Sequence, residues 1–155
     1  MRKRRRVPPF LLPLGLIFVI CLLSFGLGSW LFSSERDAQA VVEDFYAYEA
    51  EGEFSKSWEV LHPFMQERFS KTAYMQDRTH VFNGHFGAET FTYTIGEGEK
   101  VEGWKMEKDR SPFDTTYKYL VTQHYKGKYG KFHFQQEVYV TKHKDNWKIV
   151  WDYNK

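Results

Sequence analysis

The spacing of hydrophobic residues divides the chain into three stretches. Residues 10–32 form an uninterrupted apolar run without a charged side chain. Residues 38–48 place apolar side chains at intervals of three and four, which is typical of a helix with one buried face. From residue 90 onward the period changes to two, as in strands with one buried face. The pattern therefore predicts one long apolar segment, then helices, then a sheet.

The helical stretch predicts three helices. The first runs from about residue 35 to 51 and ends at Gly52. A second, short helix ends at His62, because the residue before a proline, here Pro63, avoids the α conformation. A third follows Ser70, a residue type that favours helix starts. We interpret His62 as a corner residue bonding a free backbone group rather than as a catalytic group, since the local spacing fixes no partner acid.

The alternating stretch predicts four or so antiparallel strands. Residues 90–95 and 132–140 alternate apolar and polar positions, and residues 117–122 do the same. The segment from 127 to 130, Gly-Lys-Tyr-Gly, is typical of a hairpin loop, and residues 144–146 predict another turn. Helices gathered on one face of an antiparallel sheet make an α+β fold, which is the predicted fold class.

The apolar run predicts a membrane anchor. Residues 10–32, as a helix, would be about 34 Å long, enough to cross a bilayer core of about 30 Å. Basic residues at positions 2–6 precede the run and no comparable cluster follows it. The positive-inside rule then makes residues 1–9 a cytoplasmic tail and residues 33–155 an exported domain.

A cleaved signal peptide is the alternative interpretation of the same segment. The triplet Ala38-Gln39-Ala40 supplies a small-x-small cleavage site. The apolar run is, however, longer than that of a usual signal peptide, and the triplet lies inside the predicted first helix. We therefore expect a single-pass cell-membrane protein with an extracytoplasmic domain.

Charge and cysteine content narrow the class of partner. The chain has 22 Lys and Arg against 20 Asp and Glu, and setting aside the five basic residues of the tail leaves 17 against 20. Nucleic-acid binding calls for a basic face on the folded part, so no nucleic-acid partner is predicted. The single cysteine, Cys21, lies in the apolar run, so packing rather than a disulfide must stabilise the exported domain.

Three segments carry a resemblance to a known family: FYAYEAEGEFSKSWEVLHP at residues 45–63, FSKTAYMQDR at 69–78 and WKIVWD at 147–152. With the order of elements, they resemble the nuclear transport factor 2-like fold. More closely, they resemble the N-terminal, non-catalytic domain of methicillin-resistance-type penicillin-binding proteins. The resemblance covers about residues 36–153 and implies a cone-shaped domain in which a bent antiparallel sheet wraps around three helices.

The resemblance does not extend to transpeptidase chemistry. In those proteins a catalytic domain follows this region, whereas this chain ends at Lys155 and contains neither Ser-x-x-Lys nor Lys-Thr-Gly. We interpret the chain as a stand-alone accessory domain on a membrane anchor. No catalytic residue and no cofactor is predicted.

An exported enzyme or small-ligand receptor that uses the cone cavity is the alternative. The fold that the chain resembles also occurs in isomerases and dehydratases. In those enzymes an acid or histidine and a tyrosine face the cavity. A cavity holding an acid beside a tyrosine or histidine with a raised pKa would favour this alternative, and a filled interior would disfavour it. The candidates, none of which forms a sequence-local pair, are Asp44, Tyr46, His80, His85, Tyr93, Tyr119, His124 and His133.

Histidine spacing predicts no metal site. His124 and His133 fall on adjacent predicted strands of one hairpin, but no third ligand accompanies them. Binding of a ligand or partner is assigned instead to side chains of the sheet and its flanks, with core packing as the alternative for each ring. The candidates are Tyr93, Tyr117, Tyr119, Trp104, His133 and Trp151.

The expected function is non-enzymatic: the exported domain binds or positions a partner in the cell envelope, in a process such as cell-wall synthesis. The expected partners are the lipid bilayer and an envelope protein or wall polymer. The basic and aromatic run from Tyr125 to Lys131 is a candidate site for an anionic wall polymer, or is simply a solvated hairpin. A scaffold subunit of a secretion or conjugation complex is a further alternative, and the sequence determines neither the partner nor the oligomeric state.

Overall fold

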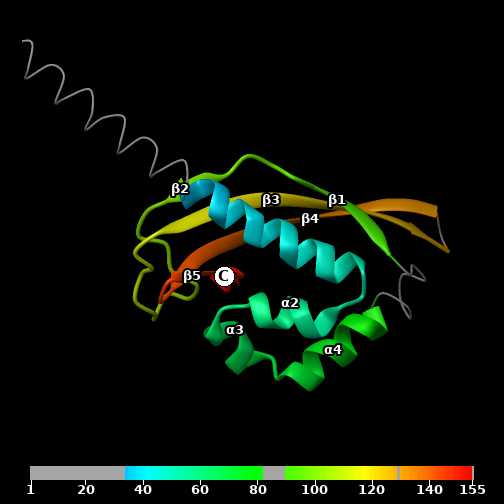
Figure 1. Ribbon diagram of the computed structural model, residues 1–155, viewed down its shortest axis with the longest axis horizontal. Helices are drawn as coiled ribbons and strands as arrows, with labels where there is room; N and C mark the ends of the chain where they lie inside the picture. Colours follow the sequence, from blue (N-terminus) through cyan, green and yellow to red (C-terminus); the bar gives the residue numbers. More distant parts are fainter. Residues whose placement is uncertain (1–33, 82–89, 129, 155) are drawn as a thin grey trace, which may run out of the picture. The chain divides into compact units, whose positions relative to one another are not determined.

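The computed structural model describes residues 34–81, 90–128 and 130–154 (Figure 1). The predicted basic tail and transmembrane helix, residues 1–9 and 10–32, lie outside these residues. Within the described part, no helix combines the length and apolar character needed to cross a membrane. Residues 35–155 form one compact unit, and the description below concerns this unit.

Four helical segments occur in the described residues, where the sequence predicted three. A long helix covers residues 34–50, followed by α2 (Phe54–Val60), α3 (Pro63–Arg68) and α4 (Lys71–Thr79). The prediction of three was wrong because Pro63 both ends α2 and starts a helix of its own, a position at which its missing N–H costs nothing. Gly52 ends the long helix as predicted: its φ of 73° is left-handed, and its N–H donates to the Glu49 carbonyl.

The corner between α2 and α3 confirms the structural interpretation of His62. Its Nδ1 atom accepts a hydrogen bond from the Phe64 backbone N–H at 3.2 Å, which caps α3. Its own N–H donates to the Ile149 carbonyl at 2.9 Å, tying the corner to the last strand. The imidazole is 3% exposed and lies among the rings of Phe64, Phe113 and His143. Ser70 likewise caps α4, accepting from the Ala73 N–H at 3.3 Å.

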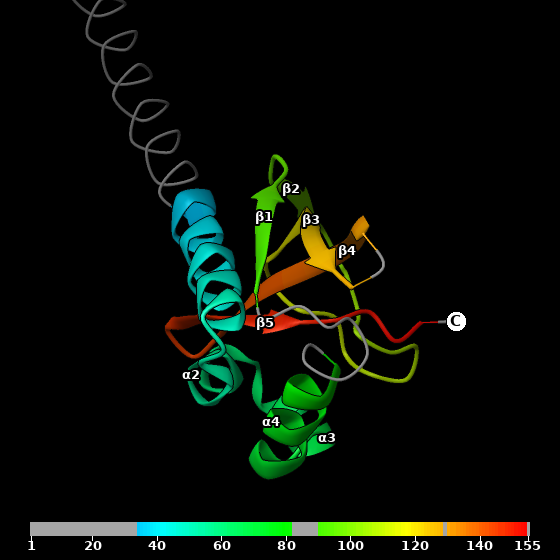
Figure 2. The same ribbon diagram turned by 90° about the vertical axis from the view of Figure 1, so that its right-hand side faces the viewer.

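In the described residues, five strands form one antiparallel sheet. They are β1 (Phe91–Ile95), β2 (Glu99–Val101), β3 (Thr116–Gly127), β4 (Gly130–His143) and β5 (Asn146–Val150), in the order β1-β3-β4-β5 with β2 also pairing with β3. The predicted hairpin loop is confirmed, since Gly127 is opposite Gly130 at the end of the β3–β4 ladder. Figure 2 shows the long helix lying across the sheet, with α2, α3 and α4 together below it. The α+β class is therefore confirmed.

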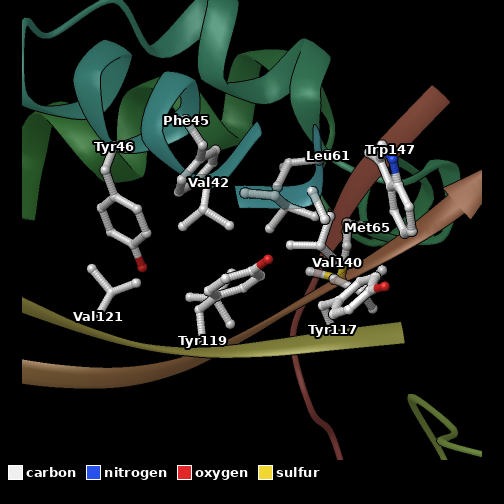
Figure 3. Close-up of a cluster of buried hydrophobic side chains, with 14 of the residues drawn as sticks. Val42, Phe45, Tyr46, Leu61, Met65, Tyr117, Tyr119, Val121, Val140 and Trp147 are labelled. Carbon is white, nitrogen blue, oxygen red and sulfur yellow. The ribbon is translucent and has the colours of Figure 1, made fainter. Parts of the chain in front are cut away.

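Side chains fill the space between the long helix and the inner face of the sheet. Val42, Phe45 and Tyr46 project from the helix toward Tyr119 and Val121 of β3 (Figure 3). All five are at most 1% exposed. This continuous packing follows from the two hydrophobic periods of the sequence. A period of 3.6 places the apolar side chains of the helix on one side, and a period of two places those of each strand on one face of the sheet.

The outer face of the sheet has two unlike halves. At one end, the Trp104 ring stacks on Tyr139 with ring centroids 4.1 Å apart, and Phe113 stacks on the other side of Trp104 at 5.7 Å. Tyr139 is therefore only 5% exposed although it alternates with the core residues of β4. We call this the covered half. The other end, toward the β3–β4 hairpin loop, carries exposed polar side chains and is called the open half.

Candidate functional site

The structure places the six predicted ligand or partner residues in separate environments. Tyr117 and Tyr119 are 4% and 0% exposed on the inner face, and the Tyr119 hydroxyl donates to the Glu35 carbonyl at 3.0 Å. The Tyr93 hydroxyl donates to the Glu43 carbonyl at 3.2 Å. The hydroxyls of Tyr93 and Tyr119 thus join the sheet to the long helix, and the Tyr117 ring packs against Trp147 with ring centroids 5.6 Å apart.

The other three predicted residues lie at the periphery of the core. Trp104 belongs to the covered half described above. Trp151 borders a small pocket, and its Nε1 atom is buried without a hydrogen-bond acceptor among the described residues. His133 is exposed on the open half of the outer face and borders a larger pocket. The structure thus brings the six residues to two pockets and a packed core rather than to one site.

A buried polar cluster centred on Glu49 was missed by the sequence analysis. The Glu49 side chain belongs to the long helix and is 1% exposed. Its Oε1 atom accepts hydrogen bonds from the hydroxyls of Ser57 at 2.5 Å and Tyr74 at 2.7 Å, and its Oε2 atom lies 2.8 Å from Nε of Arg78. The signal that could have revealed it is spacing: Glu49 lies four residues after Phe45, so it falls on the apolar stripe.

Electrostatics fix the protonation of this cluster. Burial by itself lowers the pKa of the Arg78 guanidinium, but Glu49 and then Tyr74 raise it, and the net pKa lies above the ordinary value. Burial raises the pKa of the Tyr74 hydroxyl, Arg78 opposes this, and Glu49 raises it further. Arg78 is therefore a permanent cation and Tyr74 a neutral hydrogen-bond donor, and both contact the Glu49 carboxylate.

A small pocket of about 180 Å³ adjoins this cluster. It is lined by Phe69, Tyr74, Asp77, Arg78 and Trp151. Its volume is below the roughly 300 Å³ at which ligand pockets usually begin. Glu49 also contacts the hydroxyls of Ser57 and Tyr74 and the Arg78 guanidinium, so both of its oxygens are already engaged within the domain. The cluster has the residue types of an acid–tyrosine site, but its geometry is that of a closed structural network.

A larger pocket of about 440 Å³ lies on the open half of the outer face, and we call it the hairpin pocket. Strand register builds it: Lys126 of β3 is opposite Lys131 of β4, and His124 is opposite both His133 of β4 and Thr92 of β1. The two imidazole centroids are 6.3 Å apart. The described lining is Thr90, Phe91, Thr92, His124, Tyr125, Lys126, Lys131, Phe132 and His133.

The described lining of the hairpin pocket contains cationic and hydroxyl side chains and no carboxylate. A neutral row borders it, in which the Gln135 amide donates to the Thr122 hydroxyl at 3.1 Å. Farther along the same face, the positive Lys118 ammonium lies 2.8 Å from a Glu99 carboxylate oxygen and 3.7 Å from one of Glu137. Positive charge is therefore neutralised toward the covered half, whereas the part of the hairpin pocket that the structure describes contributes no carboxylate.

Metal ligation was also considered for the histidines of the hairpin pocket. Among the residues that the structure describes, no three His, Cys, Asp or Glu side chains are grouped so as to hold a metal ion. His124 and His133 are together as the strand pattern predicted, but as a pair. What the pocket offers chemically is positive charge and hydrogen-bond donors.

In comparison with known proteins, the chain matches no protein-family model and no curated protein sequence.

Proposed function

We propose that this chain is a non-enzymatic binding protein of the cell envelope. In this proposal residues 10–32 anchor it in the membrane, residues 1–9 face the cytoplasm, and residues 33–155 form an exported domain of the nuclear transport factor 2-like fold. The domain binds or positions an envelope protein or wall polymer. The order of elements and the packing of the long helix against the inner face of the sheet support this fold, and the charge asymmetry around the apolar run supports the topology.

One observation carries the binding function. The inner face of the sheet is filled by core side chains, whereas the hairpin pocket opens on the outer face, where Lys, His and Thr side chains line it together with three aromatic residues. A binding protein needs an accessible, chemically distinct surface, and this pocket supplies one on rigid strands. Catalysis in the cone would instead need reactive groups around an interior space.

The partner proposal is tested by recovery from solubilised membranes. The full-length chain, tagged at its C-terminus, is cross-linked in intact cells, extracted and purified. We expect an envelope protein or wall polymer to be enriched over a variant in which Lys126 and Lys131 are replaced by Glu. Recovery of neither a protein nor a polymer by the wild type would contradict the proposal. Equal recovery by the two forms would place the binding surface outside the hairpin pocket.

The topology is tested separately. Membranes are washed with alkaline carbonate, and intact cells are treated with protease from outside. We expect the chain to stay with the membrane pellet and residues 33–155 to be accessible to protease only from the outer side. A mature chain released into the medium with a new N-terminus just after Ala40 would support the cleaved-signal alternative instead.

A second candidate is enzymatic, and the contact of Glu49 with Tyr74 favours it. An acid beside a tyrosine of raised pKa is the arrangement expected of an isomerase or dehydratase on this fold. Against it stand the ion pair with Arg78 and the small volume of the neighbouring pocket. The Glu49→Gln variant separates the two candidates, because it should leave partner recovery intact under the binding proposal and abolish any turnover under the enzymatic one.

A further inference from the structure

The hairpin pocket differs from the rest of the exported domain in charge. Residues 33–155 carry more Asp and Glu than Lys and Arg, yet the described lining of this pocket has two lysines and two histidines and no carboxylate. Lysines directly opposite on neighbouring strands repel each other and lower sheet stability. Lys126 and Lys131 occupy such positions at the end of the β3–β4 ladder. An anion placed between the two ammonium groups would remove this repulsion.

The pocket also has the donors that an oxyanion needs. Lys126 and Lys131 supply ammonium groups from one cross-strand pair, and His124 and His133 supply ring N–H groups from the adjacent pair. Thr92 adds a hydroxyl from β1, on the far side of His124. Phosphate oxygens accept several such hydrogen bonds at once, and a cluster of donors from three strands surrounds a tetrahedral group better than a single side chain does.

The shape of the pocket distinguishes a polymer from a membrane surface. Surfaces that bind lipid bilayers combine basic residues with Trp, Phe or Leu side chains that enter the interface. The large hydrophobic side chains exposed in the described part of the chain are Met75, Leu120 and Phe134, and none of them lines the hairpin pocket. Phe91, Tyr125 and Phe132 also line the pocket, but Phe91 and Tyr125 are buried and Phe132 is half-buried, so none of these rings is exposed for insertion into a bilayer. A hollow of about 440 Å³ with several basic side chains suits a chain of discrete charged groups rather than a flat bilayer.

We propose that the hairpin pocket binds a phosphate-bearing polyanion, with Lys126 and Lys131 contacting the phosphate groups and His124, His133 and Thr92 completing the donor set. This inference rests on the proposed binding function and names the chemistry of the partner. It predicts a polymer whose repeating unit carries a phosphodiester or phosphate group. The neutral row of Thr122 and Gln135 marks the edge of the site toward the covered half.

The test uses the full-length chain in an uncharged detergent and short-chain polyphosphate as the probe. Affinity is measured by calorimetry at several salt concentrations, for the wild type and for Lys126→Gln/Lys131→Gln. The double variant should bind at least about tenfold more weakly, which corresponds to about 1.4 kcal/mol. The slope of log affinity against log salt should also fall by about 1.5, since each lost phosphate contact removes roughly 0.7 to 0.9.

A matched control removes the same charge from the same strands. Lys118→Gln/Lys142→Gln takes one lysine from β3 and one from β4, both outside the described lining of the pocket. It should change the affinity less than about twofold. An equal loss in the control would show that attraction is diffuse and would overturn the proposal. Absence of binding by the wild type at low salt would overturn it as well.

Two further arms separate the sources of a phosphate group and the two proposals. A soluble short-chain phosphatidylglycerol is titrated in parallel, below its micelle concentration. Tighter binding of this lipid than of polyphosphate, lost in Lys126→Gln/Lys131→Gln, would assign the pocket to a lipid headgroup and overturn the polymer assignment.

Recovery of one envelope partner by both the wild type and this variant would overturn the anion inference while leaving the binding function standing. Recovery of no partner by the wild type would instead count against the proposed function.

Discussion

The Glu49 cluster and the hairpin pocket hold similar polar side chains under opposite conditions. Inside the domain, the Glu49 carboxylate meets Arg78 and two hydroxyls, so each charge has an opposite charge within 2.8 Å. On the outer face, four cationic or titratable side chains line one pocket whose described lining has no carboxylate. Low-dielectric surroundings require charges to be paired, whereas water at the surface screens the repulsion between like charges and so tolerates them near one another. The first arrangement therefore serves the fold, and the second is available to an anion.

The largest effect is expected from breaking the buried pair. Replacing Arg78 by Met leaves the Glu49 carboxylate buried without its counter-charge and should lower the free energy of unfolding by about 3 to 5 kcal/mol. Chemical denaturation of the full-length protein measures this. Adding Glu49→Gln should recover part of the loss, because the uncompensated charge is gone.

The control for this prediction lies on the same helix. Lys71 of α4 makes an exposed ion pair with Glu59 at 2.7 Å. Replacing Lys71 by Met should cost less than about 1 kcal/mol, as for most exposed ion pairs. If Arg78→Met were no more destabilising than Lys71→Met, the Glu49 cluster would not be the structural network described here.

A pH effect of the next size is expected from His62. Burial, followed by nearby His143, Arg110 and Lys148, lowers the pKa of His62 to about 4 from an unfolded value near 6.5. The unfolded chain therefore binds the proton more readily than the folded one. Stability from the neutral ring is fully present above pH 6.5 and is lost as the pH falls from 6.5 to about 4, by an amount on the order of 3 kcal/mol.

Denaturation at several pH values between 7 and 4.5 measures how the free energy of unfolding changes with pH. The comparison variant is His62→Asn, because Asn can still cap α3 but has no group that titrates in this range. We expect the wild type to lose stability across the window and the variant to show a flatter profile. Parallel profiles for the two proteins would contradict the assignment of the slope to His62.

A smaller loss is expected when the covered half is opened. Trp104→Ala removes the ring that stacks between Tyr139 and Phe113, and should cost about 2 kcal/mol, below the value for a fully buried tryptophan. Tyr139 would also become accessible to water. Its pKa is now raised to about 12 by burial and then by the adjacent Glu137, while Trp104 itself lowers it by a smaller amount. Because burial is the largest cause, the pKa should fall toward the ordinary value in the variant, which a spectrophotometric titration reports. An unchanged tyrosine titration would show that Trp104 does not shield Tyr139.

The smallest effect on stability is expected at the hairpin pocket itself. Lys126→Gln/Lys131→Gln should change the free energy of unfolding by no more than about 0.5 kcal/mol, and in the stabilising direction, because two opposed positive charges are removed. Thermal or chemical denaturation measures the change. A decrease in the free energy of unfolding above about 1 kcal/mol would mean that these lysines stabilise the fold. They would then not differ from Arg78 in this respect.

Much of the fold could be predicted from the sequence because local rules decide it. The change of period at residue 90 separates the helices from the sheet, and Gly52, Pro63 and Ser70 mark helix ends through backbone preferences that act over one or two residues. Pro63 was expected to end one helix and to start a new turn, and the structure extends that turn into the separate helix α3. The role of His62 was predicted because the residue before a proline at a helix start is a natural cap.

The candidate sites were less predictable. The run from Tyr125 to Lys131 was recognised as a candidate, but register alone adds His124, His133 and Thr92 to the same pocket. Trp104 and Tyr139 meet across 35 positions of sequence, so no local pattern shows that one covers the other. The partners of Glu49 lie 8, 25 and 29 residues away, on α2 and α4.

The sequence by itself determined the class of fold, the ends of most helices and the faces of the strands, because periodicity and backbone preference act between neighbours along the chain. The tertiary structure decided which charges are neutralised and which are left together. That outcome depends on strand register and helix packing, which bring distant side chains within a few ångströms and set how much water surrounds them. Glu49 and Arg78 are the charges that the fold pairs, and Lys126 and Lys131 are the like charges that it places opposite each other.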